Sequence, residues 1–392
     1  MSVLAERLVQ DVPERRPALG STAVAGPTLE GKIVSGAEWD AIVAGFDEVC
    51  QEQLHAFAAS RWPSVIQEPM VFLANGEVVG GSLNMVQRLP LGIGAIAVSK
   101  WGPMLRFAGR ADAGAVHAGM VEALISEYAD KRGYMLSVLP RASVEPANAA
   151  HRRLVERGFR RGSELLFPNR YMVALRLDDA AQRKSFHQKW RYHLNRSEKA
   201  GLSFERASPE RLAEFEALYA AMTDRKQFTD HSAYETIAPL MLLDEKLRPE
   251  LFFVRHEGEL VAGALIFKAG DRAVYLYGAT NDKALPLRAG YFMHWHIIRW
   301  LRDHTSAVWY DLGGTDGFQG LHQFKKGMVG EAGVIRPVPP VANYASNRLA
   351  YLAGAGAFAA RDLVHMFRRN VDGWRNPKAR PTQIRSGDEA SE

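Results

Sequence analysis

The sequence predicts a mixed α/β protein made of two repeats of one folding unit, each a mixed sheet flanked by helices, followed by a C-terminal helix. The first observation is a repeated hairpin: Phe72-Leu73 with Gly76-Glu77-Val78-Val79-Gly80-Gly81 matches Phe253-Val254 with Gly258-Glu259-Leu260-Val261-Ala262-Gly263. The second is the order that follows each hairpin, namely a strand, a long helix and another strand. Two copies of one unit explain both observations.

Length and composition limit the class of protein. With 392 residues the chain is long enough for two domains, and its 47% apolar and 24% charged residues are typical of a soluble globular protein. The net charge of +5 favours anionic partners. One cysteine, Cys50, excludes an internal disulfide and indicates a reducing cytoplasm. No uncharged apolar stretch reaches transmembrane length, so we expect a cytoplasmic protein, with membrane association left open.

The first half predicts a disordered leader over 1–30 and a first domain over 31–177. Ser35 and Glu38 form a capping box that predicts the opening helix. The Asn75-Gly76 turn then predicts a hairpin. The expected elements are a second helix over 46–60, the hairpin over 70–85, a strand over 94–100, helices over 111–132 and 148–157 around a strand over 135–139, and a closing strand near 171–175.

The second domain is expected over 178–340 and begins with a basic helical run. Arg183, Lys189, Arg191 and Arg196 belong to this run, with aromatic residues such as Trp190 interleaved. A solvated helix face is one interpretation. A face that receives phosphates, or the acceptor arm of a tRNA, is the other. A helix over 209–224, a hairpin over 251–267, a strand over 273–279 and a helix over 289–304 follow.

The end of the chain predicts an Ala-rich helix within 341–375 and a disordered tail over 376–392. We expect the helix to pack on the first domain. Because arginines stand among its apolar residues, contact with a membrane surface is the alternative.

The stretch 307–327 is the strongest candidate for a site. A short strand ends at Gly313-Gly314, and a loop with Asp316 leads to Lys325 and Lys326. Backbone amides and positive charge therefore meet at the carboxyl end of a strand, which suits a phosphate or a developing oxyanion. The alternative is an ordinary turn followed by solvated lysines. No metal site is predicted, because the histidines are scattered.

Several motifs together identify a resemblance that spans from about Trp39 to Val338. They are Arg88-Leu89-Pro90, Lys100-Trp101-Gly102-Pro103-Met104, Trp190-Arg191-Tyr192-His193-Leu194-Asn195-Arg196-Ser197-Glu198-Lys199-Ala200-Gly201-Leu202, Thr223-Asp224-Arg225, Tyr275-Leu276-Tyr277-Gly278-Ala279, and Asp311-Leu312-Gly313-Gly314 with Phe324-Lys325. As a set they resemble the Fem-type (FemABX) non-ribosomal peptidyltransferases and the related BioF2-like acetyltransferase domains. These proteins are built as two tandem GNAT-like domains.

The resemblance implies an acyltransferase that moves an acyl or aminoacyl group to an amine of a cell-envelope precursor, either peptidoglycan or polysaccharide. The donor substrate is aminoacyl-tRNA or acyl-CoA, and no tightly bound cofactor is expected. Lys325 is expected to stabilise the tetrahedral oxyanion, with the backbone of Phe324 beside it. A non-catalytic double-GNAT module that binds tRNA or a membrane assembly is the alternative function.

The resemblance also implies a set of substrate-binding residues. Arg225 is expected to face the diphosphate of an anionic precursor, with Thr223, Tyr275 and Tyr277 in the same cleft. Asp316, Trp190 and Arg191 complete the predicted set. Tyr275 and Tyr277 stand two residues apart on a strand, so we expect them to point to one face.

The proton that the amine must lose requires an acceptor, for which Asp282, Asp316 and His322 are candidates.

Two departures from the family stand out. Val98 to Arg106 differs from the family's Tyr-x-Pro-Lys/Arg-Gly-Pro pattern, and no coiled-coil arm is present, which makes a tRNA donor less certain. Arg106 to Ala111 also fits a loop that holds the pyrophosphate of acyl-CoA, although a chance match is the more common explanation.

Overall fold

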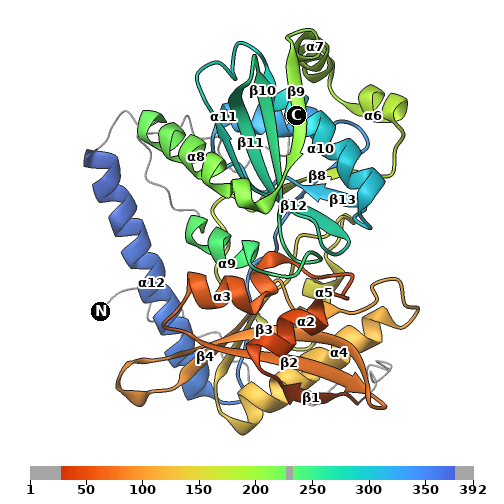
Figure 1. Ribbon diagram of the computed structural model, residues 1–392. Helices are drawn as coiled ribbons and strands as arrows, with labels where there is room; N and C mark the ends of the chain where they lie inside the picture. The colour runs from red at the N-terminus through yellow and green to blue at the C-terminus, as the bar shows by residue number, and fades with distance from the viewer. Residues whose placement is uncertain (1–27, 227–232, 376–392) are drawn as a thin grey trace.

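A computed structural model describes residues 28–226 and 233–375 of the chain and shows two sheets, one in each half of the molecule (Figure 1). Residues 1–27 of the predicted leader and the whole predicted tail lie outside the described residues. Residues 28–30 of that leader are described, and Glu30 already belongs to the first strand.

The first sheet has the strand order β1-β2-β3-β4-β6-β15-β7. Its strands are β1 (Glu30–Ile33), β2 (Ile66–Ala74), β3 (Glu77–Arg88), β4 (Ala95–Lys100), β6 (Met135–Leu139), β15 (Ala342–Tyr344) and β7 (Arg160–Arg161), with β5 (Met104–Leu105) paired to β3. Its helices are α2 (Gly36–Val43), η1 (Gln51–Gln53), α3 (His55–Arg61), η2 (Pro90–Gly92), α4 (Ala113–Leu124), the π-helical continuation η3 (Ile125–Lys131) and α5 (Ala149–Glu156). The predicted capping box of Ser35 and Glu38 opens α2.

The second sheet has the strand order β14-β8-β13-β12-β11-β10-β9. Its strands are β14 (Val334–Pro337), β8 (Asn169–Ala174), β13 (Trp309–Asp311), β12 (Arg272–Thr280), β11 (Glu259–Phe267), β10 (Glu250–His256) and β9 (Leu202–Ala207). Its helices are α6 (Asp179–Ser185), α7 (Gln188–Ser197), η4 (Pro209–Arg211), α8 (Leu212–Lys226), η5 (Tyr234–Thr236), α9 (Ile237–Met241), α10 (Ala289–His304) and α11 (Gln319–Val329).

The predicted repeat is confirmed by the topology of the two sheets. In each, an antiparallel run ends in a parallel pair: β4 with β6 in the first sheet and β12 with β13 in the second. The two hairpin turns also match in conformation, since Asn75 and Glu257 both have φ 51° and the following glycines have φ 82° and 81°. Glycine tolerates this left-handed conformation without strain, which explains Gly76 and Gly258.

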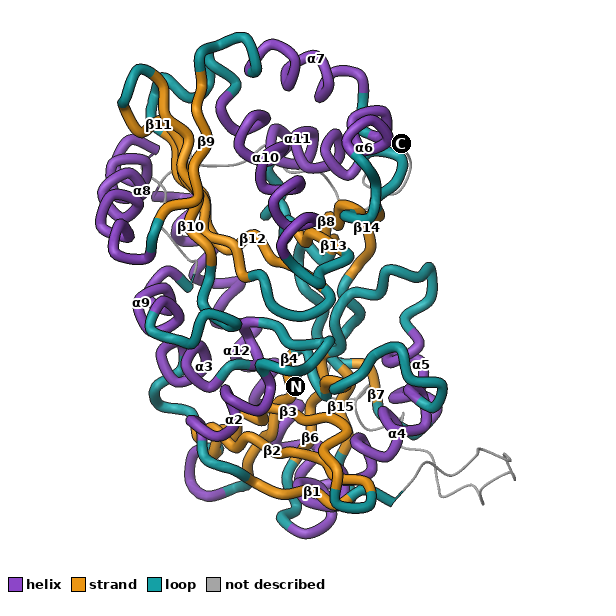
Figure 2. Tube along the Cα trace, turned by 45° about the vertical axis from the view of Figure 1, so that its right-hand side comes forward, coloured by secondary structure: helices purple, strands orange, loops and turns teal. Residues whose placement is uncertain are grey.

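Each sheet also receives a strand from outside its own half, which differs from the predicted domain organisation. The strand near 171–175, expected to close the first domain, is β8 and pairs with β13 and β14 in the second sheet. The chain near 341, expected to begin a helix, forms β15 between β6 and β7 of the first sheet. Tyr171, Met172 and Val173 are fully buried, so β8 is an interior strand whose apolar run does not say which sheet it enters. Figure 2 shows loop segments crossing between the halves.

The C-terminal helix α12 (Arg348–Arg375) lies along one side of the molecule (Figure 1). Tyr351, Ala353, Ala357 and Phe358 pack against a cluster in the first sheet that contains Ile96. Among the described residues, no helix combines the length and the apolar character that crossing a membrane requires.

Candidate active site

The second sheet opens at the carboxyl end of β13. Strands β12 and β13 are paired only from Arg272–Trp309 to Val274–Asp311, whereas β4 and β6 stay paired over five consecutive residues. Beyond Val274, β12 separates from the chain that continues past β13. The turn at Gly313, with φ 76°, lies at this opening. The parallel ladder is therefore shorter in the second domain than in the first, and it ends just before the turn at Gly313.

Lys325 lies at this opening and is directed at the turn. The side chain projects from α11 and is 6% exposed, and its Nζ donates hydrogen bonds to the backbone oxygens of Leu312 and Gly314. Burial lowers the pKa of Lys325 to about 8, and Arg170 lowers it further while Asp311 and Asp316 act in the opposite direction. An ammonium has three N–H donors, so two bonds to carbonyls leave one donor for a substrate.

An ion pair fixes the turn that holds Lys325. Arg170, on the inserted strand β8, donates from Nε and Nη2 to Asp311 at 3.0 to 3.1 Å. Asp311 in turn accepts a hydrogen bond from the backbone N–H of Gly313 at 2.9 Å. The Arg170 guanidinium also lies 5.9 Å from the ring centre of Trp101 in the first domain. Asp311 belongs to one of the motifs described above, whereas none of those motifs contains Arg170.

Aromatic side chains form the wall on the α10 side. Phe324 lies 5.6 Å from His294 and 4.9 Å from Tyr291 between ring centres, and Tyr275 lies 4.9 Å from His294. His294 Nδ1 is 3.1 Å from the hydroxyl of Tyr310. Burial, and secondarily Lys325, lowers the pKa of His294 to about 3, so this ring is neutral and adds no second charge.

Tyr275 and Tyr277 point to opposite faces of the sheet, so the prediction of a shared face is wrong. Tyr275 packs with the α10 core, whereas Tyr277 packs with the α8 core near Tyr219 and Tyr234. The reason is a register shift in the pairing of β11 with β12, because Leu265 pairs with Tyr277 but the next residue pairs with Tyr275. The hydroxyl of Tyr275 occupies the space that a side chain at Gly278 would need.

Arg225 and Thr223 lie at the end of α8, beside the end of β12. Arg225 Nη1 is 2.8 Å from Asp282 Oδ1, and its Nη2 donates to the backbone oxygen of Thr280 at 3.0 Å. Thr223 donates its hydroxyl hydrogen bond to Ala220 in its own helix. The structure thus groups Arg225 with a candidate base, Asp282, rather than with the turn that binds Lys325.

The remaining predicted residues fall into separate places. Trp190 is 2% exposed and packs against Phe186 and Tyr291, with Phe324 at 6.3 Å between ring centres. Arg191 donates to the backbone oxygens of Lys184 and Phe186, which ties α7 to the end of α6. Asp316 is exposed at φ 50°. His322 is buried, and its Nδ1 is 2.6 Å from the hydroxyl of Tyr171.

Residues 184–326 match the family model of the acetyltransferase (GNAT) domain. This stretch of the second half of the chain is therefore similar to a GNAT domain. The chain is also 31% identical over 114 residues to Lipid II:glycine glycyltransferase of Staphylococcus epidermidis, and 35% identical over 77 residues to the protein of that name from Staphylococcus aureus. These matches cover 27% and 18% of this chain, and 25% and 18% of the relatives' own length.

Solved structures are similar to this chain over both halves of the fold. FemX matches with a TM-score of 0.67 at 18% identity, covering 82% of this chain and 98% of FemX. A protein of unknown function from Bacteroides thetaiotaomicron matches with a TM-score of 0.52 at 15% identity, covering 81% and 98% of the two chains. The predicted resemblance to the Fem and GNAT proteins is therefore confirmed, and the fold is shared with FemX.

The pKa of Lys325 predicts how activity of the GNAT domain depends on pH. If the cationic form stabilises an oxyanion, activity falls as pH rises through about 8, because Lys325 then loses its proton. The measurement is the pH dependence of kcat/KM in wild type and in Lys325→Arg. Because arginine keeps its charge, any activity left in that variant should lack the decline near pH 8. A decline of the same midpoint in both proteins would show that another group titrates.

Proposed function

We propose that this chain transfers an aminoacyl group from an aminoacyl-tRNA to an amine of a lipid-linked peptidoglycan precursor. The observation that carries the proposal is Lys325, a buried ammonium held by two backbone carbonyls just beyond the carboxyl end of the parallel ladder of β12 and β13. A charge placed in this way costs little reorganisation when negative charge develops beside it.

The reaction needs no nucleophilic side chain. The acceptor amine attacks the carbonyl carbon of the aminoacyl ester and forms the new C–N bond, while the carbonyl oxygen becomes negative and accepts a hydrogen bond from Lys325 Nζ. The C–O bond to the ribose then breaks, and the proton lost by the amine ends on the ribose hydroxyl. Among the candidate bases, Asp316 is one whose charge acts on Lys325. Asp282 is instead paired with Arg225.

The acceptor follows from the relatives. Two glycyltransferases whose names specify lipid II match parts of this chain at 31% and 35% identity. Because such an acceptor is anchored in the membrane, the proposal includes contact of this chain with the cytoplasmic face of the membrane. In its support, Leu91 on the β3–β4 turn is 99% exposed, and Leu349 and Leu352 on α12 are also exposed.

The donor is argued from a cluster of cations where α7 meets the start of α10. His193 has its pKa lowered by burial and then by Arg288, Lys189 and Arg196, so all three cations lie close to its ring. Arg288 stands at the N-cap of α10 with φ 58°, and this helix has no side-chain cap. Tyr291 links the cluster to Phe324. Concentrated positive charge at a helix N-terminus favours a polyanion.

The loop before α10 offers less to acyl-CoA, whose pyrophosphate needs free backbone amides. Asn281 Oδ1 accepts hydrogen bonds from the N–H groups of Lys283 and Ala284, and the N–H of Ala289 is bonded to the oxygen of Ala284. These amides are therefore already used within the loop. In the first domain, β4 and β6 leave no gap between them.

The test is the binding of charged tRNA to wild type, Arg288→Gln and the matched control Arg299→Gln, measured by fluorescence anisotropy over a range of salt. Arg299 lies further along α10 and is paired with Asp179. Arg288→Gln removes one phosphate contact, so its affinity for charged tRNA should fall by about tenfold, and its slope of log K against log salt concentration should decrease by about one. Arg299→Gln should change neither quantity. Binding of acetyl-CoA without binding of charged tRNA would overturn the proposed donor. Binding of tRNA without transfer would favour the non-catalytic module.

A further inference from the structure

The turn between β3 and β4 carries a leucine in an unusual position. Leu91 is 99% exposed and has φ 59°, a left-handed conformation that costs free energy in a residue other than glycine, asparagine or aspartate. Ile93, two residues later, is also exposed. Neither the exposure nor the backbone conformation of Leu91 stabilises the turn, so this leucine points to a contact made outside the chain.

The turn is fixed to the C-terminal helix. Leu89, at the start of the turn, is buried in a cluster against which Tyr351 and Phe358 of α12 pack. Ser346, just before the helix, donates a hydrogen bond to Asp130 of η3. The turn and the first part of α12 therefore belong to one packed surface, which lies on the left side of the molecule in Figure 1.

The outward side of α12 is a stripe of apolar residues at spacings of three and four. Its exposed members are Leu349, Leu352, Gly356, Ala359 and Leu363. This spacing places them on one face of the helix. Tyr351 and Phe358, which pack inward, lie on the other side. One apolar face is enough to hold a helix on a core, so the outer stripe is a second apolar face that the described chain leaves uncovered.

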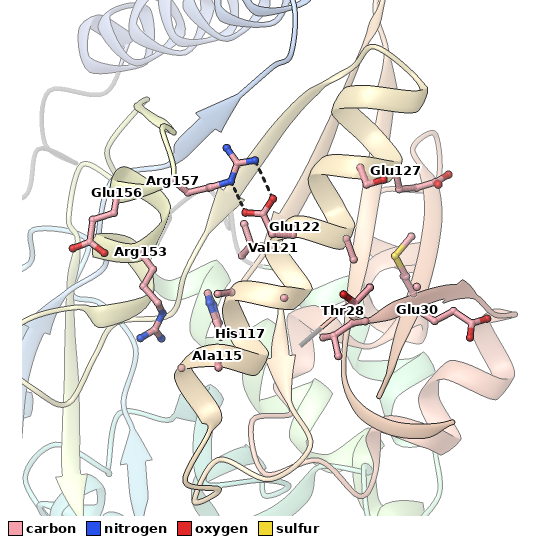
Figure 3. A pocket seen from close by; sticks show the side chains of 18 of the residues that line it. Thr28, Glu30, Ala115, His117, Val121, Glu122, Glu127, Arg153, Glu156 and Arg157 are labelled. Carbon is pink, nitrogen blue, oxygen red and sulfur yellow. Dashed lines mark hydrogen bonds and ion pairs between the residues drawn. The ribbon is translucent and has the colours of Figure 1, made fainter. Parts of the chain in front are cut away.

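The other face of the first sheet is unsuited to an apolar contact. Side chains alternate along β4, so Ala97 packs toward α4 whereas Ile96 packs toward α12. A groove of about 1400 Å³ runs along α4, and Figure 3 shows Glu122, Glu127 and Glu156 around it, all paired with arginines. Charged groups of this kind would lose their hydration against an apolar partner.

The apolar surface at the turn and α12 is instead flanked by unpaired cations. Arg88 precedes the turn and Arg348 begins α12; both are exposed, and neither forms an ion pair within the described part of the chain. Positions 78–111 and 332–361 contain no Asp or Glu. Leucines beside unpaired arginines suit a bilayer with anionic lipid, where apolar groups enter the acyl region and cations stay at the headgroups.

A protein partner fits this surface less well. The exposed apolar side chains project from a turn and from the outward side of a helix, and they are aliphatic. Tight protein interfaces depend instead on Trp, Tyr and Arg anchors seated in pockets, and leucine is under-represented among them. The surface therefore favours a bilayer over a second protein.

We propose that Leu91, Ile93 and the outer stripe of α12 dock this chain on a bilayer that contains anionic lipid, with Arg88 and Arg348 at the lipid headgroups. The inference rests on the proposed function for the reason to be at a membrane, because a lipid-linked acceptor is anchored there. It adds which surface faces the bilayer and which class of lipid that surface selects.

The test is the binding of the full chain to vesicles of equimolar phosphatidylcholine and phosphatidylglycerol, measured by co-sedimentation without donor or acceptor. Wild type should bind these mixed vesicles at least about tenfold more tightly than vesicles of phosphatidylcholine alone. Leu91→Asn should bind the mixed vesicles about tenfold more weakly, because it removes an aliphatic side chain from the acyl region. The control Leu285→Asn changes another highly exposed leucine, in the second domain, and should bind like wild type.

Thermal melting separates loss of docking from loss of folding. Asparagine adopts a φ near 59° more readily than leucine, so Leu91→Asn should melt at or above the temperature of wild type although it loses vesicle binding. The double variant Arg88→Gln with Arg348→Gln should bind the mixed vesicles at least about tenfold more weakly and leave binding to phosphatidylcholine vesicles unchanged.

Three results would overturn the docking surface. They are no binding of wild type to the mixed vesicles, equal loss in Leu91→Asn and Leu285→Asn, and self-association that Leu91→Asn abolishes without vesicle binding, which would assign the surface to a second copy of the chain. Because transfer is not measured, none of these results bears on the role of Lys325. Failure of transfer would likewise leave the vesicle result standing.

Discussion

Replacing Lys325 by methionine should lower the rate of acyl transfer by about 100- to 1,000-fold while the chain stays folded. Methionine keeps the length of the side chain among the buried groups but removes the ammonium that faces the turn after β13. The loss should appear in kcat, because the charge acts on the oxyanion of the transition state and less on the bound ground state.

Lys326→Met is the matched control, since it removes a lysine from the next position of α11. It should keep activity within about threefold of wild type, a change below 1 kcal/mol in the barrier. Circular dichroism and thermal melting of both variants would establish that they fold. Full activity in a folded Lys325→Met would rule out the proposed oxyanion role.

Replacing Arg170 by methionine should have the second largest effect, on stability as well as on rate. Asp311 is 6% exposed, so removing Arg170 leaves a buried carboxylate without its ion-pair partner, which costs about 3 to 5 kcal/mol. The same carboxylate orients the Gly313 N–H, and the adjoining carbonyls hold Lys325. Urea unfolding gives the stability, and kcat gives the positioning effect.

Two further variants make this prediction specific. Arg176→Met, at an exposed position just beyond β8, should change the free energy of unfolding by less than about 0.5 kcal/mol. The double variant Arg170→Met with Asp311→Asn should recover part of the stability, because the unpaired charge is gone. Equal stability of Arg170→Met and Arg176→Met would show that the ion pair does not hold the turn.

Local patterns in the sequence predicted much of the fold because local chemistry determines those elements. The turns at Asn75-Gly76 and Glu257-Gly258 need positive φ, and both hairpins form where these pairs stand. The strand predicted before Gly313 is β13, which ends at Asp311, and Lys325 lies against the turn that follows it.

The features that were missed depend on contacts distant in sequence. The apolar run of β8 fits either sheet, and only packing decides that it pairs with β13 and β14. One register shift between β11 and β12 reverses the face of Tyr277 relative to Tyr275. Arg170 pairs with Asp311 across 141 residues of sequence, so no local motif contains the pair.

In the proposed function, Lys325 stabilises the transition state in which an aminoacyl group is joined to an amine of a cell-envelope precursor. The most direct measurement follows radiolabelled glycine from charged tRNA onto a lipid-linked muramyl pentapeptide, with wild type and Lys325→Met side by side. We expect the label to enter the pentapeptide through an amide bond, and Lys325→Met to transfer it at least about 100-fold more slowly. Equal transfer by both proteins, or transfer from acetyl-CoA alone, would contradict it.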